Sequence, residues 1–473
     1  MDNKKAPTEK ELENIVKKVD KLVKKTEKLK TNASASASSS NNNGDQVLMK
    51  QQLRQLMENM ALMEQSGLIK ASAKKDLGSH KFWSTQPVPN YDEDITESGP
   101  IEPDIPYDQI RKEPLPLPKE FEWCEIDMSQ EKQVKELYEL LTFNYVEDDE
   151  AQFRFDYSAE FLKWALQPPN WKQSWLVGVR VAANKKLVAF ISGIPVALRT
   201  YEKIHHLTEI NFLCVHKKLR SKRLAPVLIK EVTRRSHLEN IFQAVYTAGA
   251  VLPKPVSTCR SLNPKKLVEC NFSRIPARST LSRMIKQYKV PDETNTPGLR
   301  EMRLEDVGEV RELLNKYLSR FDLAPVFETD EDVKHWILPH EKVVWSYVVE
   351  DAQTKKITDV FSFYSLPSSV IGNPKHNTLN AAYMFYYAVD TTHCEDKEKE
   401  NKYIRKRLNE LVNDALILAK KAGFDVMNSL NLMDNAYYVD EQKFGKGDGF
   451  LNYYLYNWKC PDVTQSKVGL VML

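Results

Sequence analysis

The chain has 473 residues and a formal net charge of +3, so it is nearly neutral for its size. Near-neutrality excludes a dedicated nucleic-acid binder and requires any basic patch to be local, while a hydrophobic content of 42% is ample for two or three folded domains. The six cysteines form no CxxC or CxxH pairing, which argues against a zinc site or a disulfide framework and favours reduced thiols in a cytosolic protein. The sequence shows neither a secretory signal nor an apolar run of membrane-spanning length.

Residues 1–79 are basic and of low complexity, and we expect them to be largely disordered. Within them, residues 8–30 place apolar side chains at helical spacing among many lysines, which predicts a basic amphipathic helix at most. Such a helix is either a solvated, partly formed segment or an electrostatic tether to ribosomal RNA or an anionic membrane. Residues 32–44 are a Ser- and Asn-rich linker.

Residues 80–118 are rich in proline and poor in periodic apolar positions, which excludes a regular helix or a central strand. We expect an ordered arm draped over the core, with the aromatic rings of Phe82 and Trp83 as its anchors. The compact part of the protein is therefore expected to start near His80.

The rest of the chain contains a weak internal repeat. Residues 125–145 and 300–321 each predict a helix after a short strand, with Ser129 and Asp306 as candidate N-caps. Strand-like runs follow each of these helices and alternate with further helices. The runs are residues 175–182, 186–198, 209–215 and 241–249 in the first half, and 343–351, 359–367, 381–390, 424–432 and 450–458 in the second.

This alternation predicts two similar domains, residues 80–295 and 296–473. The expected fold class is α+β, or mixed α/β, in two related units. The segment 393–410 is highly charged, and we expect it to be a surface excursion.

Residues 209–226, EINFLCVHKKLRSKRLAP, join an apolar strand to a helix through a dense basic turn. Backbone N–H groups at a helix N-terminus, preceded by a cluster of Lys and Arg, make an anion site. Five side chains could hold a diphosphate and a third phosphate, as in coenzyme A: Lys217, Lys218, Arg220, Lys222 and Arg223. The alternative is a solvated basic face or a nuclear-localisation patch. The direct fusion to an apolar helical run favours the anion site.

Five segments carry a family resemblance: EINFLCVHK (209–217), KFGKGDG (443–449), NYVEDDEAQFRFDYS (144–158), KFWSTQPVP (81–89) and YNWKCP (456–461). Together they resemble the protein N-myristoyltransferases over about residues 80–473. The resemblance implies two acetyltransferase-like (GNAT) domains related by a pseudo-twofold axis, the first binding myristoyl-CoA and the second completing the peptide groove. It implies transfer of myristate from CoA to the α-amino group of an N-terminal glycine. Myristoyl-CoA would be a co-substrate, and no cofactor would be permanently bound. From the sequence we also expect a cytoplasmic monomer, partly attached to ribosomes or membranes through its basic N-terminus.

The family's catalytic groups match five positions of this sequence. The resemblance implies an oxyanion hole made by the main-chain N–H groups of Phe212 and Leu213, and a general base supplied by the terminal carboxylate of Leu473. It also implies that Asn211 and Thr247 orient the amine. The apolar tail suits a buried terminus, although its residues alone are more typical of an ordinary packed C-terminal strand.

Two further groups of positions match the family's binding residues. The acyl-CoA group comprises Lys81, Phe82, Trp83, Phe212, Leu213, Cys214, Val215, Arg220, Ser221, Lys222, Arg223, Leu224 and Ala225. The peptide group comprises Tyr145, Val146, Glu147, Asp148, Asp149, Phe153, Arg154, Phe155, Tyr157, Gly249, Tyr364, Ser368, Asn428, Leu430, Asp448, Gly449 and Leu451. Its acidic run would attract the substrate's ammonium group. Gly447 and Gly449 suggest a close backbone approach at the substrate's first residue.

One departure from the family concerns the segment after Arg260. Relatives carry a short further run there, aromatic-x-His-Arg, before the SLNP motif, whereas Arg260 is followed directly by Ser261. The missing residues line the peptide groove in the family. The missing residues therefore keep one alternative open, an acyl-CoA-binding or ribosome-associated scaffold with impaired catalysis because of the short 255–265 loop. A second, separate alternative is a GNAT-like enzyme for shorter acyl groups or other amines.

Overall fold

The computed structural model describes residues 82–89, 93–146, 152–248 and 256–473. All of them belong to one compact unit, Asp76–Leu473. The expectations for residues 1–79, including the basic amphipathic helix, lie outside these described residues. Within the described ranges, no helix is both long and apolar enough to cross a bilayer.

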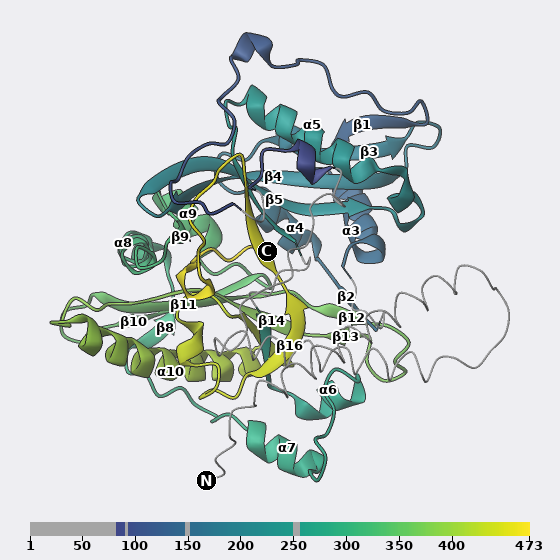
Figure 1. Ribbon diagram of the computed structural model, residues 1–473. Helices are drawn as coiled ribbons and strands as arrows, with labels where there is room; N and C mark the ends of the chain where they lie inside the picture. Colours follow the sequence, from purple (N-terminus) through teal and green to yellow (C-terminus); the bar gives the residue numbers. More distant parts are fainter. Residues whose placement is uncertain (1–81, 90–92, 147–151, 249–255) are drawn as a thin grey trace, which may run out of the picture. The chain divides into compact units, whose positions relative to one another are not determined.

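The first sheet has its strands in the order β1-β3-β4-β5-β6-β17, with β9 pairing to β4. Helix α5 covers one face and helices α3 and α4 cover the other (Figure 1). Successive side chains of β3 point to opposite faces of the sheet. Val177 and Val179 pack with Leu228 of α5 in one core cluster, whereas Leu176 packs in the larger core. The elements are Phe121–Glu125 (β1), Glu131–Asn144 (α3), Ala159–Leu166 (α4), Leu176–Val181 (β3), Leu187–Thr200 (β4), Lys203–Val215 (β5), Leu224–Leu238 (α5), Ala244–Ala248 (β6), Leu323–Pro325 (β9) and Asn452–Tyr456 (β17).

The second sheet has its strands in the order β16-β7-β15-β14-β11-β10-β8. Helix α10 lies on one face, and α8 and α9 lie on the other (Figure 1). The elements are Val256–Ser261 (β7), Leu299–Glu301 (β8), Val307–Leu318 (α8), Asp330–Trp336 (α9), Val344–Glu350 (β10), Ile357–Ser365 (β11), Ala381–Val389 (β14), Lys397–Lys421 (α10), Val426–Leu430 (β15) and Gly445–Phe450 (β16). A small third sheet and two short helices flank it: Phe153–Phe155 (β2), Ser368–Val370 (β12), Thr378–Leu379 (β13), Pro264–Glu269 (α6) and Leu281–Tyr288 (α7).

The two large sheets repeat one arrangement. In the first, β5 leads through α5 to β6, which pairs parallel with β5; in the second, β14 leads through α10 to β15, which pairs parallel with β14. This repetition agrees with the internal repeat expected from the sequence. The sheets also exchange strands, because β7 joins the second sheet and β17, near the end of the chain, joins the first. The division at residues 295 and 296 therefore stays a prediction.

Each of the expected strand-like runs contains a strand, and the two expected helices are α3 and α8. The cap expected at Ser129 is wrong: Gln130 precedes α3 and gives no side-chain cap, while the Ser129 hydroxyl donates to Asp127 Oδ1 (2.6 Å). Asp306 caps a different turn, since its Oδ2 accepts the backbone N–H of Arg303 (2.7 Å) at the start of the 3-10 turn that precedes α8.

The expectation of a surface excursion over residues 393–410 is also wrong. Most of this segment forms the first half of α10, a helix of 25 residues. Ile404 and Leu408, one turn apart, are fully buried in the main core. The high density of charge reflects the exposed face of an amphipathic helix whose buried stripe recurs every three or four residues.

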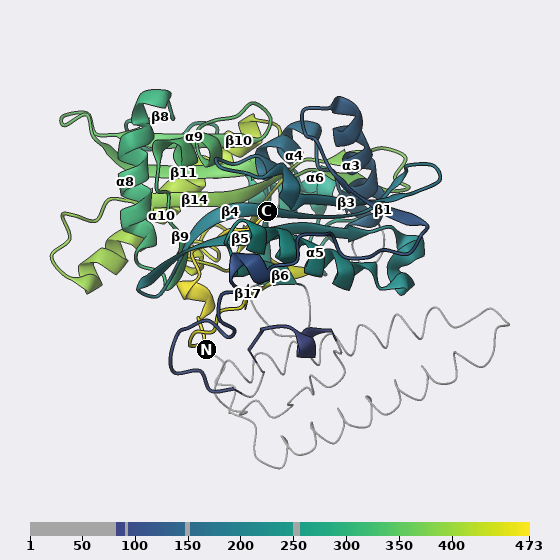
Figure 2. The same ribbon diagram turned by 90° about the horizontal axis from the view of Figure 1, so that it is seen from above.

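The proline-rich arm is extended, as expected, with short 3-10 turns at Trp83–Thr85 and Tyr107–Gln109. It is held to the core by polar contacts at separated points. Gly99 and Lys459 exchange backbone hydrogen bonds of 2.9 Å, and the Leu115 N–H donates to Glu231 Oε2 of α5 (3.0 Å). Figure 2 shows the described part of the arm running past β17 and α5.

Candidate active site

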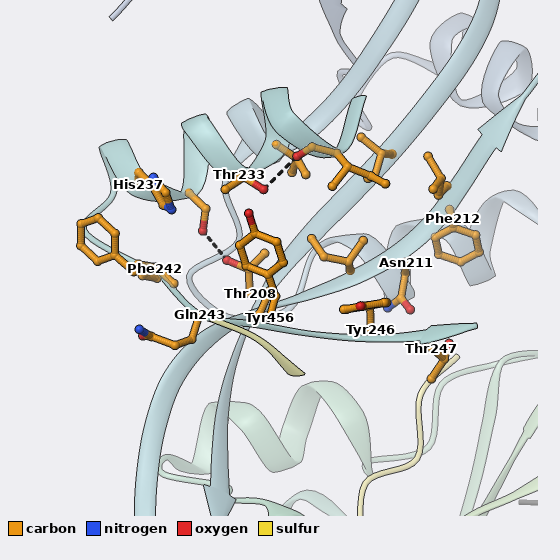
Figure 3. Close-up of a pocket in the computed structure, with 18 of the residues that line it drawn as sticks. Thr208, Asn211, Phe212, Thr233, His237, Phe242, Gln243, Tyr246, Thr247 and Tyr456 are labelled. Carbon is orange, nitrogen blue, oxygen red and sulfur yellow. Dashed lines mark hydrogen bonds between the residues drawn. The ribbon is translucent and has the colours of Figure 1, made fainter. Parts of the chain in front are cut away.

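The main cavity lies where β5 and β6 stop pairing. Thr208–Ile210 pair with Ala244–Tyr246, and the parallel pairing of the two strands ends there. The cavity takes in about 930 Å³ of space, part of which is open to solvent, and it is lined by residues of β5, β6 and α5 together with Trp83 and Leu473. Figure 3 shows His237, Phe242 and Gln243 toward one end, and Asn211, Phe212 and Thr247 toward the other. A volume of this size suits a sizeable organic ligand.

The wall under α5 is mostly apolar, and its three hydroxyl groups are satisfied within the protein. Ile191, Ile210, Ile229, Val232 and Phe242 supply most of this wall. The hydroxyls of Thr208 and Ser236 bond to each other (2.5 Å), and the Thr233 hydroxyl donates to the Ile229 carbonyl (2.9 Å) (Figure 3). Burial lowers the pKa of His237, which favours the neutral ring. A wall that is mostly apolar, with its hydroxyl groups paired and its histidine neutral, can hold a hydrocarbon chain at little desolvation cost.

A β-bulge interrupts β5 beside the cavity. Phe190 pairs with Cys214 but Ser192 pairs with Asn211, so Phe212 and Leu213 together stand opposite one residue of β4. Phe212 has φ of 55°, a left-handed conformation that is rare for an aromatic residue. The bulge takes the two backbone amides out of the regular ladder at a position that borders the cavity.

The ring of Phe212 stabilises this backbone conformation. It is 1% exposed and packs against Tyr145 and Tyr157, with ring centroids 5.9 Å and 5.2 Å away. Burial raises the pKa of Tyr145 to about 12, and a hydrogen bond from the Phe212 backbone to the phenol partly opposes that rise. A left-handed non-glycine residue costs roughly 1–2 kcal/mol, and dense aromatic packing offsets it.

The C-terminus reaches the same cavity. Residues 468–472 are buried, and the partly exposed Leu473 lines the cavity with Asn211 and Thr247. The tail is fixed by backbone hydrogen bonds, from the Val471 N–H to the Tyr386 hydroxyl (3.1 Å) and from the Met433 N–H to the Val468 carbonyl (3.0 Å). Figure 1 shows the C-terminus between the two large sheets. The expectation of a buried tail is confirmed.

Glu209 supports the site through Asn211 without lining the cavity, and the sequence reasoning missed it. It precedes Asn211 by two positions on β5, so both side chains stand on one face. The Asn211 amide donates to Glu209 Oε1 (2.8 Å), and both residues are buried. Burial raises the pKa of Glu209 to about 7. Its place as the one carboxylate of β5 was the available signal.

The arm and the basic turn meet the cavity from outside. Trp83 lines it and stacks on Tyr246 with ring centroids 5.4 Å apart and planes 2° apart. The expected basic turn is a 3-10 turn, Lys217–Lys222, that leads directly into α5. Arg220 donates to the Asn144 carbonyl (2.6 Å), which ties the turn to α3. Arg223, with φ of 57°, marks the helix start.

The expected site residues divide into three sets. Those that line the cavity are Trp83, Tyr145, Asn211, Phe212, Leu213, Thr247 and Leu473. Lys81, Glu147, Asp148, Asp149 and Gly249 lie outside the described residues, and for Asp448 and Gly449 only the strand they belong to is described. The others lie elsewhere in the fold: Cys214, for example, turns into the core, where burial raises its thiol pKa to about 12.

The expected peptide residues form a wall of aromatic rings next to the cavity. Phe155 and Tyr157 are in contact (5.8 Å), Tyr364 stacks on Tyr383 (5.4 Å), and Ser368 pairs with Phe155 across β12 and β2. Phe153 is different, because it packs with Phe272 in a separate cluster beside α6. Gly447 makes the close approach that was expected, but to Ser257 of β7 within the protein. A Cβ added at Gly447 would lie 2.6 Å from Ser257 Oγ.

The short connection after Arg260 is accommodated within β7. Arg260 pairs with Met427 and is 3% exposed. Its guanidinium donates to the carbonyls of Ser261 (2.6 Å) and Tyr288 (3.3 Å) and lies over the Tyr288 ring. Burial lowers the pKa of Arg260 to about 10. The strand is continuous, and Arg260 fastens it to α7.

Comparisons with known proteins agree over nearly all of this architecture. Residues 100–259 match the family model of the myristoyl-CoA:protein N-myristoyltransferase N-terminal domain, and residues 269–471 match that of its C-terminal domain. Glycylpeptide N-tetradecanoyltransferase 2 of Danio rerio is 52% identical over 444 residues, 93% of this chain and 87% of that protein. The Schizosaccharomyces pombe glycylpeptide N-tetradecanoyltransferase is 51% identical over 422 residues, 87% of this chain and 90% of that protein.

Solved structures agree as well. The Saccharomyces cerevisiae N-myristoyltransferase with bound myristoyl-CoA superposes with a TM-score of 0.80 at 47% identity, covering 85% of this chain and 100% of that chain. A second structure of the same yeast enzyme with bound myristoyl-CoA gives a TM-score of 0.80 at 45% identity, over 86% of this chain and 97% of that one.

Proposed function

This chain belongs to the myristoyl-CoA:protein N-myristoyltransferase family, and we propose that it transfers myristate from myristoyl-CoA to the α-amino group of an N-terminal glycine in the cavity between β5 and β6. Family membership confirms the resemblance and the mixed α/β fold expected from the sequence. One observation supports this site above all: a single cavity is bordered by the bulge at Phe212 and Leu213, by Asn211 and Thr247, and by the end of the chain at Leu473.

Myristoyl-CoA fits this cavity as a substrate. The apolar wall under α5 suits the hydrocarbon chain, and the turn Lys217–Lys222 presents basic side chains at the start of α5 for the phosphates. Trp83 of the arm, stacked on Tyr246, closes the cavity from the other side. Exclusion of water along the chain would also strengthen electrostatic interactions at the thioester.

The thioester oxygen would be stabilised by the backbone. We propose the N–H groups of Phe212 and Leu213, displaced from the ladder by the bulge, as the donors for the oxyanion that forms as the amine attacks the thioester carbon. The Phe212 N–H, which bonds to the Tyr145 phenol in this structure, would exchange that partner for the oxyanion. Each such donor contributes on the order of 3 kcal/mol to lowering the barrier. The tetrahedral intermediate then collapses: the C–S bond breaks, CoA leaves as a thiolate that takes up the second proton lost by the attacking nitrogen, and the amide remains.

The amine must lose a proton before it attacks. An α-amino group has a pKa of roughly 7.7–8.0, so only a modest shift is needed near neutrality. The terminal carboxylate of Leu473 is the proposed base, and burial of the tail around it favours proton transfer from the ammonium group. Asn211 and Thr247 are proposed to orient the amine. With the Asn211 amide nitrogen bonded to Glu209, its carbonyl oxygen is the group left to accept from the amine.

The residues of the peptide groove, the partners of the N-terminal region, the oligomeric state and the cellular location also remain proposals. The short connection after Arg260 supports the alternative of an acyl-CoA-binding scaffold, while the continuous strand β7 supports an intact enzyme. Contact of the basic N-terminus with a ribosome or an anionic surface, the monomeric state and the cytoplasmic location remain predictions from the sequence.

One assay tests the proposal. The purified full chain is incubated with myristoyl-CoA and a peptide that begins with glycine and carries serine at its fifth position, and peptide mass is followed. We expect a myristoyl mass increase that is absent with an alanine-starting peptide. No increase, with myristoyl-CoA still bound, would favour the scaffold. An acetyl mass increase with acetyl-CoA, competing with myristoyl transfer, would favour an enzyme for shorter acyl groups.

A further inference from the structure

The segment around α6 and α7 concentrates positive charge. Residues 264–289 contain seven basic residues and one acidic residue, a net charge of +6 in a chain whose total is +3. The rest of the chain is therefore slightly acidic. Figure 1 shows α6 and α7 next to each other, projecting from the second sheet.

Most of this charge is exposed and unpaired. Lys266 is the one basic residue of the segment that forms an ion pair within the described residues, with Asp425 (2.6 Å). The single acid, Glu269, is itself engaged by His376 (2.8 Å) and Lys375 (3.4 Å). The exposed basic residues are Lys265, Arg274, Arg278, Arg283, Lys286 and Lys289.

Exposed apolar side chains lie among these charges. The segment contains Phe272, Ile275 and Ile285, which are 36%, 40% and 44% exposed. Ile371, 39% exposed, belongs to the neighbouring loop, where the Asn373 amide donates to the Glu269 carbonyl (2.8 Å). These four are a large share of the ten exposed large apolar side chains among the described residues. We call these residues, with the six exposed basic ones, the α6–α7 surface.

Most of the surface of helix α7 is exposed. Met284 is its only buried residue, and Leu281 and Tyr288 lie partly buried on the same side. Arg260 holds its C-terminal end through the Tyr288 carbonyl (3.3 Å). Arg283, Ile285 and Lys286 are exposed on the remaining sides. The helix is thus fixed to the protein by one edge and presents cations and an isoleucine to its surroundings.

We propose that the α6–α7 surface docks the protein on an anionic lipid membrane. Unpaired Lys and Arg side chains complement anionic headgroups, and exposed aliphatic side chains partition into the boundary between headgroups and acyl chains. A nucleic acid would use the charges, but it gains little from isoleucine side chains, because its bases stack on aromatic or guanidinium planes. The mixture of cations and isoleucines therefore favours the membrane.

The surface touches the expected peptide groove at one point. Phe272 packs edge-to-face on Phe153 of β2 (5.5 Å), one of the expected peptide residues. This link rests on the proposed function: a peptide that has just received a C14 chain would emerge beside a surface already in contact with lipid. Docking itself does not depend on catalysis, so the two claims can fail separately.

Vesicle cosedimentation of the full chain tests the docking. The probes are vesicles of phosphatidylcholine alone and of phosphatidylcholine mixed with phosphatidylserine. We expect the double variant Arg283→Glu, Lys286→Glu to bind the anionic vesicles at least about tenfold more weakly than the wild type. The matched control is Lys132→Glu, Lys135→Glu on α3, which makes the same charge change at two exposed positions elsewhere. The N-terminal region contributes the same background to every variant.

A second variant separates membrane from nucleic acid. Ile275→Ser, Ile285→Ser leaves the charge unchanged and is expected to weaken vesicle binding several-fold while leaving binding to RNA unchanged. Turnover of a short soluble peptide reports folding and the proposed function for every variant, and it should match the wild type. Equal vesicle binding by the α7 charge variant and the α3 control would overturn the proposal. So would loss of RNA binding in the charge variant together with unaltered vesicle binding in the isoleucine variant.

Discussion

Asn211 donates a hydrogen bond of 2.8 Å from its side-chain amide to the carboxylate of Glu209, two residues earlier on the same face of β5. No described residue forms an ion pair with this buried carboxylate, and the tyrosines Tyr386 and Tyr453 are the titratable groups that interact with it. The pair links a residue of the proposed amine site to a group that titrates near neutral pH. The protonation of Glu209 therefore affects both the stability of the fold and the orientation of the Asn211 side chain that is proposed to hold the amine.

The raised pKa of Glu209 predicts a pH-dependent loss of stability. Its pKa is about 7 in the folded protein against an ordinary value of 4.5, so the folded state binds the proton more tightly. The stabilisation is complete below the ordinary value and is lost as pH rises through about 7, at a total of about 3 kcal/mol. We expect Glu209→Gln, which stays neutral, to gain stability relative to the wild type from about pH 5 to 8. Urea unfolding at each pH measures this.

The control for that experiment is Glu202→Gln in the exposed turn between β4 and β5. It makes the same Glu-to-Gln change at an exposed position, so it measures the effect of losing one surface carboxylate at each pH. A constant difference between Glu209→Gln and the wild type across the pH range would show that burial does not govern the protonation of Glu209.

The proposed base predicts a sharp response to the position of the chain end. Removing Met472 and Leu473 moves the carboxylate away from the cavity, and adding one alanine after Leu473 moves it in the other direction. Both changes should abolish turnover while acyl-CoA binding persists, because the acyl wall is under α5. Leu473→Ala keeps a carboxylate in place and should retain most activity. Product mass and myristoyl-CoA binding are the measurements; full activity in the extended chain would refute the base assignment.

Local patterns predicted much of the site. The stretch 209–226 is a strand, a basic turn and a helix, as its apolar run, its charges and its helical spacing indicated. Such signals are contained within a few residues. The bulge at Phe212 was not predictable in the same way, because an aromatic residue at φ of 55° has no signature in composition and is imposed by packing against Tyr145 and Tyr157.

The remaining differences between prediction and structure depend on contacts between residues far apart in the sequence. Strand β7 crosses to the second sheet and β17 to the first, and neither choice can be read from residues adjacent in sequence. The segment 393–410 was misjudged because its charges outnumber its apolar residues, although Ile404 and Leu408 recur at helical spacing. Glu209 was passed over because its role depends on burial and on Asn211, which only the assembled sheet reveals.

The stacking of Trp83 on Tyr246 predicts a measurable share of acyl-CoA affinity. An aromatic pair contributes about 0.5–1.5 kcal/mol, so Trp83→Ala should weaken myristoyl-CoA binding by roughly 3- to 10-fold. Trp83→Phe should restore part of the loss, since a smaller ring still stacks. Tyr107→Ala, on the same arm but 63% exposed, is the matched control and should bind as the wild type. Isothermal titration calorimetry with myristoyl-CoA measures the affinity of each variant. An unchanged affinity in Trp83→Ala would place the arm outside the binding site.

Arg223 allows charge and backbone conformation to be separated at the proposed phosphate turn. Its φ of 57° is left-handed, which glycine adopts without cost, whereas alanine does not. Arg223→Gly and Arg223→Ala both remove the cation and should weaken myristoyl-CoA binding by about tenfold. Arg223→Ala keeps the strain of a left-handed residue with a Cβ, so only Arg223→Gly should raise the free energy of unfolding, by roughly 1 kcal/mol. Asn271→Gly, at φ of 62°, is the control for relief of backbone strain without loss of charge. Wild-type affinity in Arg223→Gly would remove this residue from the phosphate site and leave Lys222 and Arg220 to hold the anion.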